Sequence, residues 1–371
     1  MINDIIIKRK EKYILIEKEI VKYNKTKTGC LKVYKELPNG TKEYRIGNKI
    51  ILNKRIGSDS VYGIVYNSKI RRDENIEFAS KIYEYIKSKV LIELNMLYKF
   101  TQKVIKDICP HFPIFYGYVI CNKNNEYKDS FTKTDQNIKS ISQLTEKLPR
   151  LLREIEDKSI ITFVELANGD LDYFFKLYYN DNDKLLNALI QQYISIMFFQ
   201  YYTNRIHSDT HSGNFLFFNI KKGGYFHYRI YGVDYYLENL GFLWVIWDYD
   251  LSITVEKAIK RFHKSGKRTD DYYKIIKFYI SESNNGYNSK SGIDKNKKLA
   301  DIVISLYQSL YLFKYKEYNL KNIREFIYDV PSKLSEINID GKYLFLKSLP
   351  KKETVINNKP YIIKKNKLFK T

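Results

Sequence analysis

The sequence is poor in cysteine, tryptophan and proline, with three, two and seven residues respectively in 371. Cys30, Cys109 and Cys121 show no CxxC spacing and cannot all pair with one another, which argues against a disulfide scaffold and favours a reducing, intracellular environment. No apolar run approaches the roughly 20 residues needed to span a bilayer, and the most apolar stretch is 241–247. The first residues lack a small-residue cleavage site, so no secretory signal is indicated. We therefore expect a cytoplasmic protein without a membrane partner.

Acidic residues are also in short supply relative to basic ones. Lys and Arg total 64 against 42 Asp and Glu, a formal net charge of +22. Such an excess favours nucleic acid, nucleotides or acidic proteins as partners. However, the chain is rich in Lys, Asn, Ile and Tyr, which A/T-rich codons encode, so the base composition of the genome explains the lysines equally well. Charge alone therefore selects no partner.

Periodicity divides the chain into a strand-rich part and a helix-rich part. Two β-branched runs joined by a Gly/Ser/Asp turn predict a hairpin over 49–66. Further strands are expected at 76–83 and 160–166, with an amphipathic helix over 86–107 between them. The second half is predicted to contain helices over 185–202, 272–280 and 299–313. The fold class expected is α+β, with a boundary near Ala167.

The chain is long enough for two cores, and we divide it accordingly. Polar segments without apolar periodicity at 121–143 and 281–298 are interpreted as loops. The expected parts are an N-terminal extension over 1–45, a first lobe over 46–166, a second lobe over 167–348 and a solvated basic tail over 349–371.

The densest group of chemically capable residues lies between an apolar helix and an apolar strand. It consists of His207, Asp209, His211 and Asn214, and Asp248 follows the strand-like segment 242–246. Carboxylate and amide oxygens are ligands suited to Mg²⁺ bridging phosphates, and a further Asp can accept a proton from an attacking hydroxyl. A metal-hydrolase interpretation of His207, Asp209 and His211 needs further ligands. It is disfavoured because the other histidines show no paired spacing.

The spacing H-x-D-x-x-x-x-N over 207–214 resembles the catalytic loop of protein kinases, and 248–250 resembles their D-F-G element. Upstream segments resemble further kinase elements in the family's order: 57–66 the glycine-rich loop, 78–81 the V-A-I-K strand, and 164–167 the adenine-binding hinge. The segment 241–248 is similar to the corresponding strand in divergent kinases of large DNA viruses. The resemblance spans about residues 49 to 255. It implies a two-lobed protein-kinase-like fold with a β-rich N-lobe and a helical C-lobe, using ATP and Mg²⁺.

The resemblance also implies roles for individual residues. Nucleotide contacts are expected from Gly57, Ser58, Ser60, Gly63, Val65, Lys81, Glu165 and Ala167. Asn214 and Asp248 are expected to hold Mg²⁺, while Asp209 orients the acceptor hydroxyl, Lys81 pairs with Glu93, and His211 acts on the substrate side. Asp271 is expected to brace the loop from a helix, and His207 to bond the backbone of the loop.

Departures from the kinase pattern keep three functions open. Ser58 and Ser60 stand at glycine positions, Ser208 replaces an Arg, and no A-P-E follows Asp250. His211 stands where serine/threonine kinases have Lys, and H-x-D-x-H-x-x-N is frequent in kinase-like small-molecule phosphotransferases. The favoured function is a serine/threonine kinase acting on protein, with a small-molecule phosphotransferase and a pseudokinase or virion scaffold as alternatives. The long interval between Asn214 and Asp248 predicts an inserted hairpin near 225–233.

Overall fold

The computed structural model describes residues 4–26, 31–36, 38, 42–47, 50–56, 64–71, 73–83, 88–122, 158–266, 271–285, 296–312, 317–365 and 369. The chain forms two compact units. Unit 1 comprises Met1–Ile5, Lys106–Phe112 and Ala167–Thr371, and unit 2 comprises Ile6–Ile105 and Pro113–Leu166. The last crossing between them, from Leu166 to Ala167, lies at the boundary expected from the sequence.

Unit 2 is built on a seven-stranded antiparallel sheet of order β1-β2-β3-β4-β5-β7-β6. Its strands are β1 (Leu31–Glu36), β2 (Lys42–Ile46), β3 (Ile50–Ile56), β4 (Ile64–Ile70), β5 (Asp73–Tyr83), β6 (Phe115–Asn122) and β7 (Lys158–Val164). The hairpin expected over 49–66 is confirmed as the pairing of β3 with β4, and the strands expected at 76–83 and 160–166 correspond to β5 and β7. The sheet thus carries most of the β-rich part of the chain.

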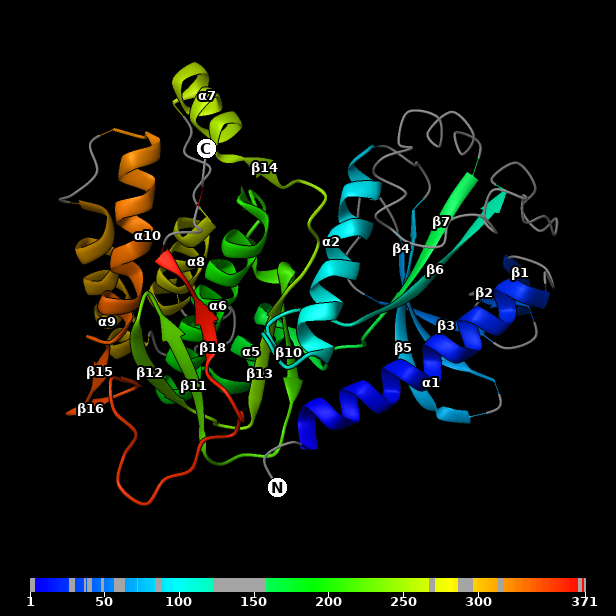
Figure 1. Ribbon diagram of the computed structural model, residues 1–371, viewed down its shortest axis with the longest axis horizontal. Helices are drawn as coiled ribbons and strands as arrows, with labels where there is room; N and C mark the ends of the chain where they lie inside the picture. Colours follow the sequence, from blue (N-terminus) through cyan, green and yellow to red (C-terminus); the bar gives the residue numbers. More distant parts are fainter. Residues whose placement is uncertain are drawn as a thin grey trace. The chain divides into compact units, whose positions relative to one another are not determined.

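Two long helices belong to unit 2, α1 (Asp4–Thr26) and α2 (Ser88–Ile105) (Figure 1). The apolar residues of α2 that recur every three or four positions are buried, which confirms the amphipathic helix: Val90, Leu91, Leu94, Leu97 and Val104. On α1, Ile16 and Ile20 are buried, and Ile20 lies against Gly117 of β6. Gly117 has φ +145°, and a Cβ there would meet Ile20 at 3.3 Å, so glycine permits both the backbone and the close approach. The segment expected as an N-terminal extension therefore contributes α1, β1 and β2 to unit 2.

Unit 1 is centred on α6 (Asn182–Thr203), whose residues 185–200 are all buried (Figure 1). A helix buried on every side needs apolar neighbours all round. Its neighbours include strand β13 (Phe242–Ile246) and the helices α5 (Leu171–Tyr178), α8 (Asp271–Asn285) and α9 (Lys297–Tyr307). The unit also contains α7 (Val255–Ser265) and α10 (Leu320–Leu334), which contact each other. The expected helices over 185–202, 272–280 and 299–313 are confirmed, although a π-helical turn over Gln308–Leu312 replaces the end of the last one.

Small sheets complete unit 1. β10 (Phe215–Asn219) lies between β8 (Gly169–Asp170) and β13 (Phe242–Ile246), and β9 (Arg205–Ile206) pairs with β14 (Ile253–Thr254). The inserted hairpin is confirmed as β11 (Tyr225–Ile230) and β12 (Val233–Glu238). β17 (Phe345–Leu346) pairs with β12, while β15 (Asn338–Ile339) pairs with β16 (Lys342–Tyr343).

The basic tail is not wholly solvated. β18 (Tyr361–Ile363) pairs in parallel with β11, and the side chains of Tyr361 and Ile363 are buried. Successive side chains of a strand point to opposite faces, so Tyr361 and Ile363 lie on the core face and Ile362, between them, is exposed. The prediction of a solvated tail rested on its many lysines, and the composition of a segment does not reveal two buried positions within it.

The α+β class is confirmed, with a β-rich region followed by helices. Of the polar loops expected over 121–143 and 281–298, the parts at 123–143 and 286–295 lie outside the described residues. The prediction was wrong at the loop ends, because 121–122 belong to β6, 281–285 to α8 and 297–298 to α9. Among the described residues, no helix is both long enough and apolar enough to cross a membrane.

Candidate functional site

The 207–214 loop is held between elements of unit 1 that leave it little freedom. It follows α6 and β9, ends in a 3-10 turn over Ser212–Asn214, and leads into β10. Asn204, with φ +53°, ends α6 in the left-handed conformation that asparagine tolerates well. The chain then reverses into β9, whose Ile206 pairs with Ile253 of β14. Both ends of the loop are therefore fixed by β-pairing.

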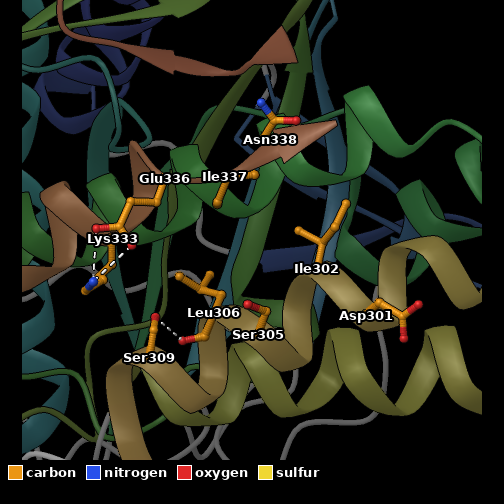
Figure 2. A pocket seen from close by; sticks show the side chains of 9 residues that line it. All are labelled: Asp301, Ile302, Ser305, Leu306, Ser309, Lys333, Glu336, Ile337 and Asn338. Atoms are coloured by element: carbon orange, nitrogen blue, oxygen red, sulfur yellow. Dashed lines mark hydrogen bonds and ion pairs between the residues drawn. The ribbon is translucent and has the colours of Figure 1, made fainter. Parts of the chain in front are cut away.

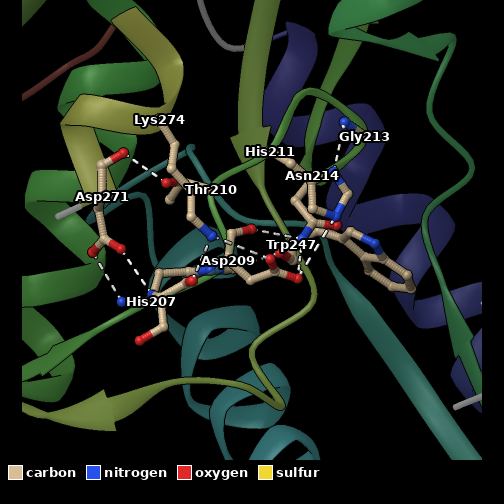
Figure 3. Close-up of polar contacts among 10 residues, drawn as sticks. His207, Asp209, Thr210, His211, Gly213, Asn214, Trp247, Asp271 and Lys274 are labelled. Atoms are coloured by element: carbon tan, nitrogen blue, oxygen red, sulfur yellow. Dashed lines mark hydrogen bonds and ion pairs between the residues drawn. The ribbon is translucent and has the colours of Figure 1, made fainter. Parts of the chain in front are cut away.

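Asp271, at the start of α8, braces the beginning of this loop (Figure 3). Its carboxylate accepts the backbone N–H of His207 at 2.9 Å, the N–H of Ser208 at 2.8 Å and the side-chain amide of Gln200 at 3.1 Å. The Thr210 hydroxyl donates to the backbone carbonyl of Asp271 at 2.6 Å. Ser208 has φ +68°, a conformation that costs energy for a residue other than glycine and is held here by these bonds. The predicted bracing contact is confirmed.

His207 is a structural residue of the loop. It is fully buried, and its Nε2 lies 2.9 Å from the carbonyl oxygen of Trp247, to which it donates. Burial lowers the pKa of His207 to about 4, so the ring is neutral at pH 7 and its proton is on Nε2. His207 was predicted to bond the backbone of its own loop; it does bond a backbone carbonyl, but that of Trp247, the residue just before Asp248.

Three donors approach the Asp209 carboxylate, and one of them is the side-chain amide of Asn214 at 3.4 Å. One carboxylate oxygen is 3.6 Å from Nε2 of His211, and the other is 3.5 Å from Nζ of Lys274 (Figure 3). Nδ1 of His211 accepts the N–H of Gly213 at 3.1 Å, which assigns the proton of a neutral ring to Nε2, on the side of Asp209. Lys274 also donates to the carbonyl of Ser208 at 2.7 Å. The carboxylate of Asp209 is 27% exposed, so it is oriented by its neighbours yet reachable.

Asn214 and Asp248 lie at the same end of one antiparallel strand pair. Phe215, the first residue of β10, is opposite Ile246, the last residue of β13, and Trp247 donates its N–H to the carbonyl of Asn214 at 3.1 Å. The side-chain amide of Asn214 donates to the backbone carbonyl of Asp209 at 2.8 Å, so its Oδ1 is the atom left for a ligand. Asp248 has φ +62°, a second strained backbone position in this region.

This donor set fits Mg²⁺ bound together with phosphates. In the part of the chain that the structure describes, no group of three or more His, Cys, Asp or Glu side chains is placed to hold a metal ion. His207, Asp209 and His211 are all among the described residues, so that finding is against the metal-hydrolase interpretation of these three. Mg²⁺ differs from such metals, because it commonly takes one or two protein oxygens, water and substrate phosphate. Asn214 and Asp248 supply two oxygens of that kind.

Lys81 and Glu93 form a buried ion pair in unit 2. Nζ of Lys81, on β5, is 3.6 Å from a carboxylate oxygen of Glu93, on α2, and the two side chains are 2% and 0% exposed. The predicted partner of Lys81 is therefore the correct one. A buried ion pair contributes little net stability, so its retention in a core calls for another reason. Val65 of β4 lies directly opposite Lys81 in the sheet.

Of the other residues predicted to contact the nucleotide, the structure describes Glu165 and Ala167. The Glu165 carboxylate binds the Arg9 guanidinium of α1 through two bonds of 2.8 and 2.6 Å, and it accepts the N–H of Ile114 at 2.7 Å. Its backbone N–H donates to the carbonyl of Ile114 at 3.0 Å, so both its side chain and its N–H are engaged inside unit 2. Ala167 is the first residue of its segment of unit 1. The other four positions lie outside the described residues: Gly57, Ser58, Ser60 and Gly63.

Two contacts of the candidate residues were not predicted from the sequence. Lys274 lies three residues after Asp271 on α8, so helical geometry puts both on the face toward the loop, and this spacing was the available signal. The pair Arg9–Glu165 had no signal, because its members are far apart in sequence and local periodicity does not reach them.

A hollow elsewhere in unit 1 carries none of the predicted residues. It has a volume of about 320 Å³ and lies between α9 and the end of α10 (Figure 2). Its wall combines the apolar side chains of Ile302, Leu306 and Ile337 with an ion pair between Lys333 and Glu336 at 2.9 Å. Its lining includes no residue of the 207–214 loop.

No family model matches this chain, and no curated protein matches it.

Proposed function

We propose that this protein is a Mg²⁺-dependent phosphotransferase of protein-kinase-like fold, which transfers the γ-phosphoryl group of ATP to a serine or threonine hydroxyl of a protein. In this proposal unit 2 is the β-rich N-lobe and unit 1 the helical C-lobe. The observation that carries the proposal is the braced loop, in which Asp271 and His207 hold Asp209 and Asn214 beside the strand end that bears Asp248.

Asp209 is proposed to orient the acceptor hydroxyl and accept its proton. Its carboxylate is partly exposed, and His211 and Lys274 flank it on either side, which limits its rotation. A positioned base of this kind contributes about 10²–10⁴-fold to the rate. Lys274 would also stabilise negative charge that develops close to Asp209.

Asn214 and Asp248 are proposed to hold Mg²⁺, which would neutralise charge on the transferred phosphoryl group. The Asn214 amide is turned so that its nitrogen meets the Asp209 carbonyl, and this orients its oxygen for the metal. Lys81, with Glu93 fixing its ammonium group, is proposed to bind the α- and β-phosphates of ATP. That role supplies the reason for keeping a buried ion pair in unit 2.

A small-molecule acceptor is the second candidate, and the His211–Asp209 contact favours it, since the same residue pattern is frequent in kinase-like small-molecule phosphotransferases. Polycationic acceptors such as aminoglycosides are disfavoured by the positive charge of Lys274 beside Asp209. A scaffold without catalysis would have no use for Lys81, Glu93, Asp209, Asn214 and Asp248 together. The resemblance to kinases of large DNA viruses stays a prediction.

The test is transfer of label from γ-labelled ATP in the presence of Mg²⁺. Acceptors are casein, a basic protein and a panel of aminoglycosides and amino sugars, with Asp209→Asn as the test variant and Asp301→Asn, an exposed position on α9, as the matched control. Label on protein that is lost in Asp209→Asn and kept in Asp301→Asn supports the proposal. Label only on a small molecule supports the second candidate. No transfer to any acceptor, together with no shift of the melting temperature by Mg²⁺ and ATP, would contradict both.

A further inference from the structure

The helix α7 begins next to the 207–214 loop. Its N-terminal residue Thr254 belongs to β14 and pairs with Arg205 of β9, the strand that leads directly into the loop. The Arg205 guanidinium fixes this junction, because it donates to the hydroxyl and the carbonyl oxygens of Ser252 at 3.2 and 2.7 Å. The side chain of Thr254 caps α7 by accepting the N–H of Lys257 at 3.3 Å. The start of α7 is therefore held in place relative to Asp209 within one unit.

One face of α7 is covered by its own unit. Val255 and Ala258 are buried, and the ring of Phe262 contacts that of Tyr318 at 5.0 Å between centroids. Successive residues of a helix are about 100° apart, so these three share a face. Because that apolar face is already packed, α7 has none to insert into a lipid surface or a partner's groove.

The opposite face of α7 is basic and exposed. A helical turn of 100° per residue brings together four exposed cations, namely Lys257, Lys260, Arg261 and Lys264. Glu256 is the one acidic residue of the helix; it lies four residues before Lys260 and so borders this face at its N-terminal end. From Lys257 to Lys264 the face extends about 10 Å, at 1.5 Å rise per residue. We call these four residues the basic face of α7.

We propose that the basic face of α7 binds acidic residues that flank the acceptor serine or threonine of a protein substrate. The inference rests on the proposed function and names its substrate class. A length of about 10 Å matches roughly three residues of an extended peptide, so the expected ligand is a short run of Asp or Glu. Lys274, beside Asp209 and 43% exposed, continues the positive charge to the acceptor position.

A peptide is favoured over nucleic acid by the place of the basic face. An acidic peptide bound there can extend past β14 and β9 toward Asp209, and the same ligand then supplies both the charge and the hydroxyl. Nucleic acid would use mainly the charge, since Phe262, the large aromatic side chain of α7, is packed on Tyr318 and against the ring of His263.

The experiment compares three peptides that share one acceptor serine and differ in three flanking residues, which are Asp, Asn or Lys. kcat and KM are measured for the full-length protein, for Lys260→Glu/Lys264→Glu and for a milder Lys260→Gln/Lys264→Gln variant. A matched control, Lys351→Glu/Lys352→Glu, reverses two adjacent exposed lysines that precede β18. The melting temperature of each variant shows whether it is folded.

We expect kcat/KM to be about 10- to 100-fold higher for the Asp peptide than for the Asn peptide, through a lower KM. Exposed ion pairs are individually weak, but several act together here. Both variants of α7 lose this preference and keep the kcat for the Asn peptide, whereas the control retains both. A preference that survives Lys260→Glu/Lys264→Glu, or equal use of all three peptides, overturns the inference and leaves the proposed function standing. No phosphorylation of any peptide or of casein overturns both. Binding of a 20-nucleotide RNA that is lost in the α7 variants, without any peptide preference, would assign the face to nucleic acid instead.

Discussion

Replacing Asp271 by alanine is expected to destabilise unit 1 by about 4 kcal/mol. The Asp271 side chain is almost fully buried, and its carboxylate accepts the backbone N–H groups of His207 and Ser208. A hydrogen bond to a charged group contributes roughly 1.5–3 kcal/mol, and a buried donor left without a partner costs a similar amount. Two such bonds give about 3–6 kcal/mol, a large part of the roughly 5–15 kcal/mol that stabilises a typical domain.

An asparagine at the same position separates charge from shape. The oxygen of Asp271→Asn can still accept from His207 and Gln200, but its NH₂ group then faces the N–H of Ser208, a donor that the carboxylate accepted. We expect a loss of about 2 kcal/mol, intermediate between the wild type and Asp271→Ala. Asp301→Ala, at an exposed position of α9, is the control and should change stability by less than about 0.5 kcal/mol.

Urea denaturation followed by tryptophan fluorescence measures the stability of unit 1, the unit that contains Asp271. The chain has two tryptophans, Trp244 and Trp247, and both belong to unit 1. With a slope of about 2–3 kcal/mol per molar urea, Asp271→Ala should lower the midpoint by about 1.5 M. A midpoint equal to that of Asp301→Ala would refute the argument that Asp271 holds the loop.

Three further predictions concern buried or strained groups. The pKa of His207 is about 4 in the folded state and 6.5 in the unfolded state, so the unfolded state binds more protons between these pH values. The free energy of unfolding should therefore decrease by up to about 3 kcal/mol as the pH drops from 6.5 to 4, which a series of urea midpoints would measure. In His207→Gln the same pH change should lower the urea midpoint less. Ser208→Gly should stabilise unit 1 by about 1 kcal/mol because it relieves the backbone at φ +68°, and an unchanged or lower midpoint would count against that strain. Glu93→Leu alone should destabilise unit 2 by about 3–5 kcal/mol, because it leaves the Lys81 charge buried without its partner. The double variant Lys81→Met/Glu93→Leu should recover most of that stability, as measured by thermal denaturation followed by circular dichroism. Equal losses of stability in the single and the double variant would argue against the ion pair.

The features predicted correctly from the sequence are local ones. The apolar stripe of α2 and the alternation in β3 and β4 repeat within a few residues, so each segment carries its own signal. The 207–214 loop is likewise short. Because a strand precedes it and another follows it, the relative positions of its residues are largely determined by the local sequence. The Lys81–Glu93 pair was found across a longer interval only because the order of the kinase-like motifs suggested it.

The features that were missed depend on contacts between distant segments. β18 docks on β11 through two apolar side chains within a lysine-rich tail, and composition gave no sign of it. The bond from Arg9 to Glu165 joins α1 to the residue after β7, so neither sequence neighbourhood contains the pattern. Tertiary pairing, rather than local propensity, decides such positions.

The central claim is tested most directly by the rate of γ-phosphoryl transfer at saturating Mg²⁺ and ATP in the wild type and in Asp209→Asn, with both proteins shown to be folded by their urea midpoints. The account predicts transfer by the wild type and a loss of about 10²–10⁴-fold in the variant, with ATP binding retained. Transfer at the same rate in both proteins, or no transfer by a folded wild type that is offered protein and small-molecule acceptors, would contradict it.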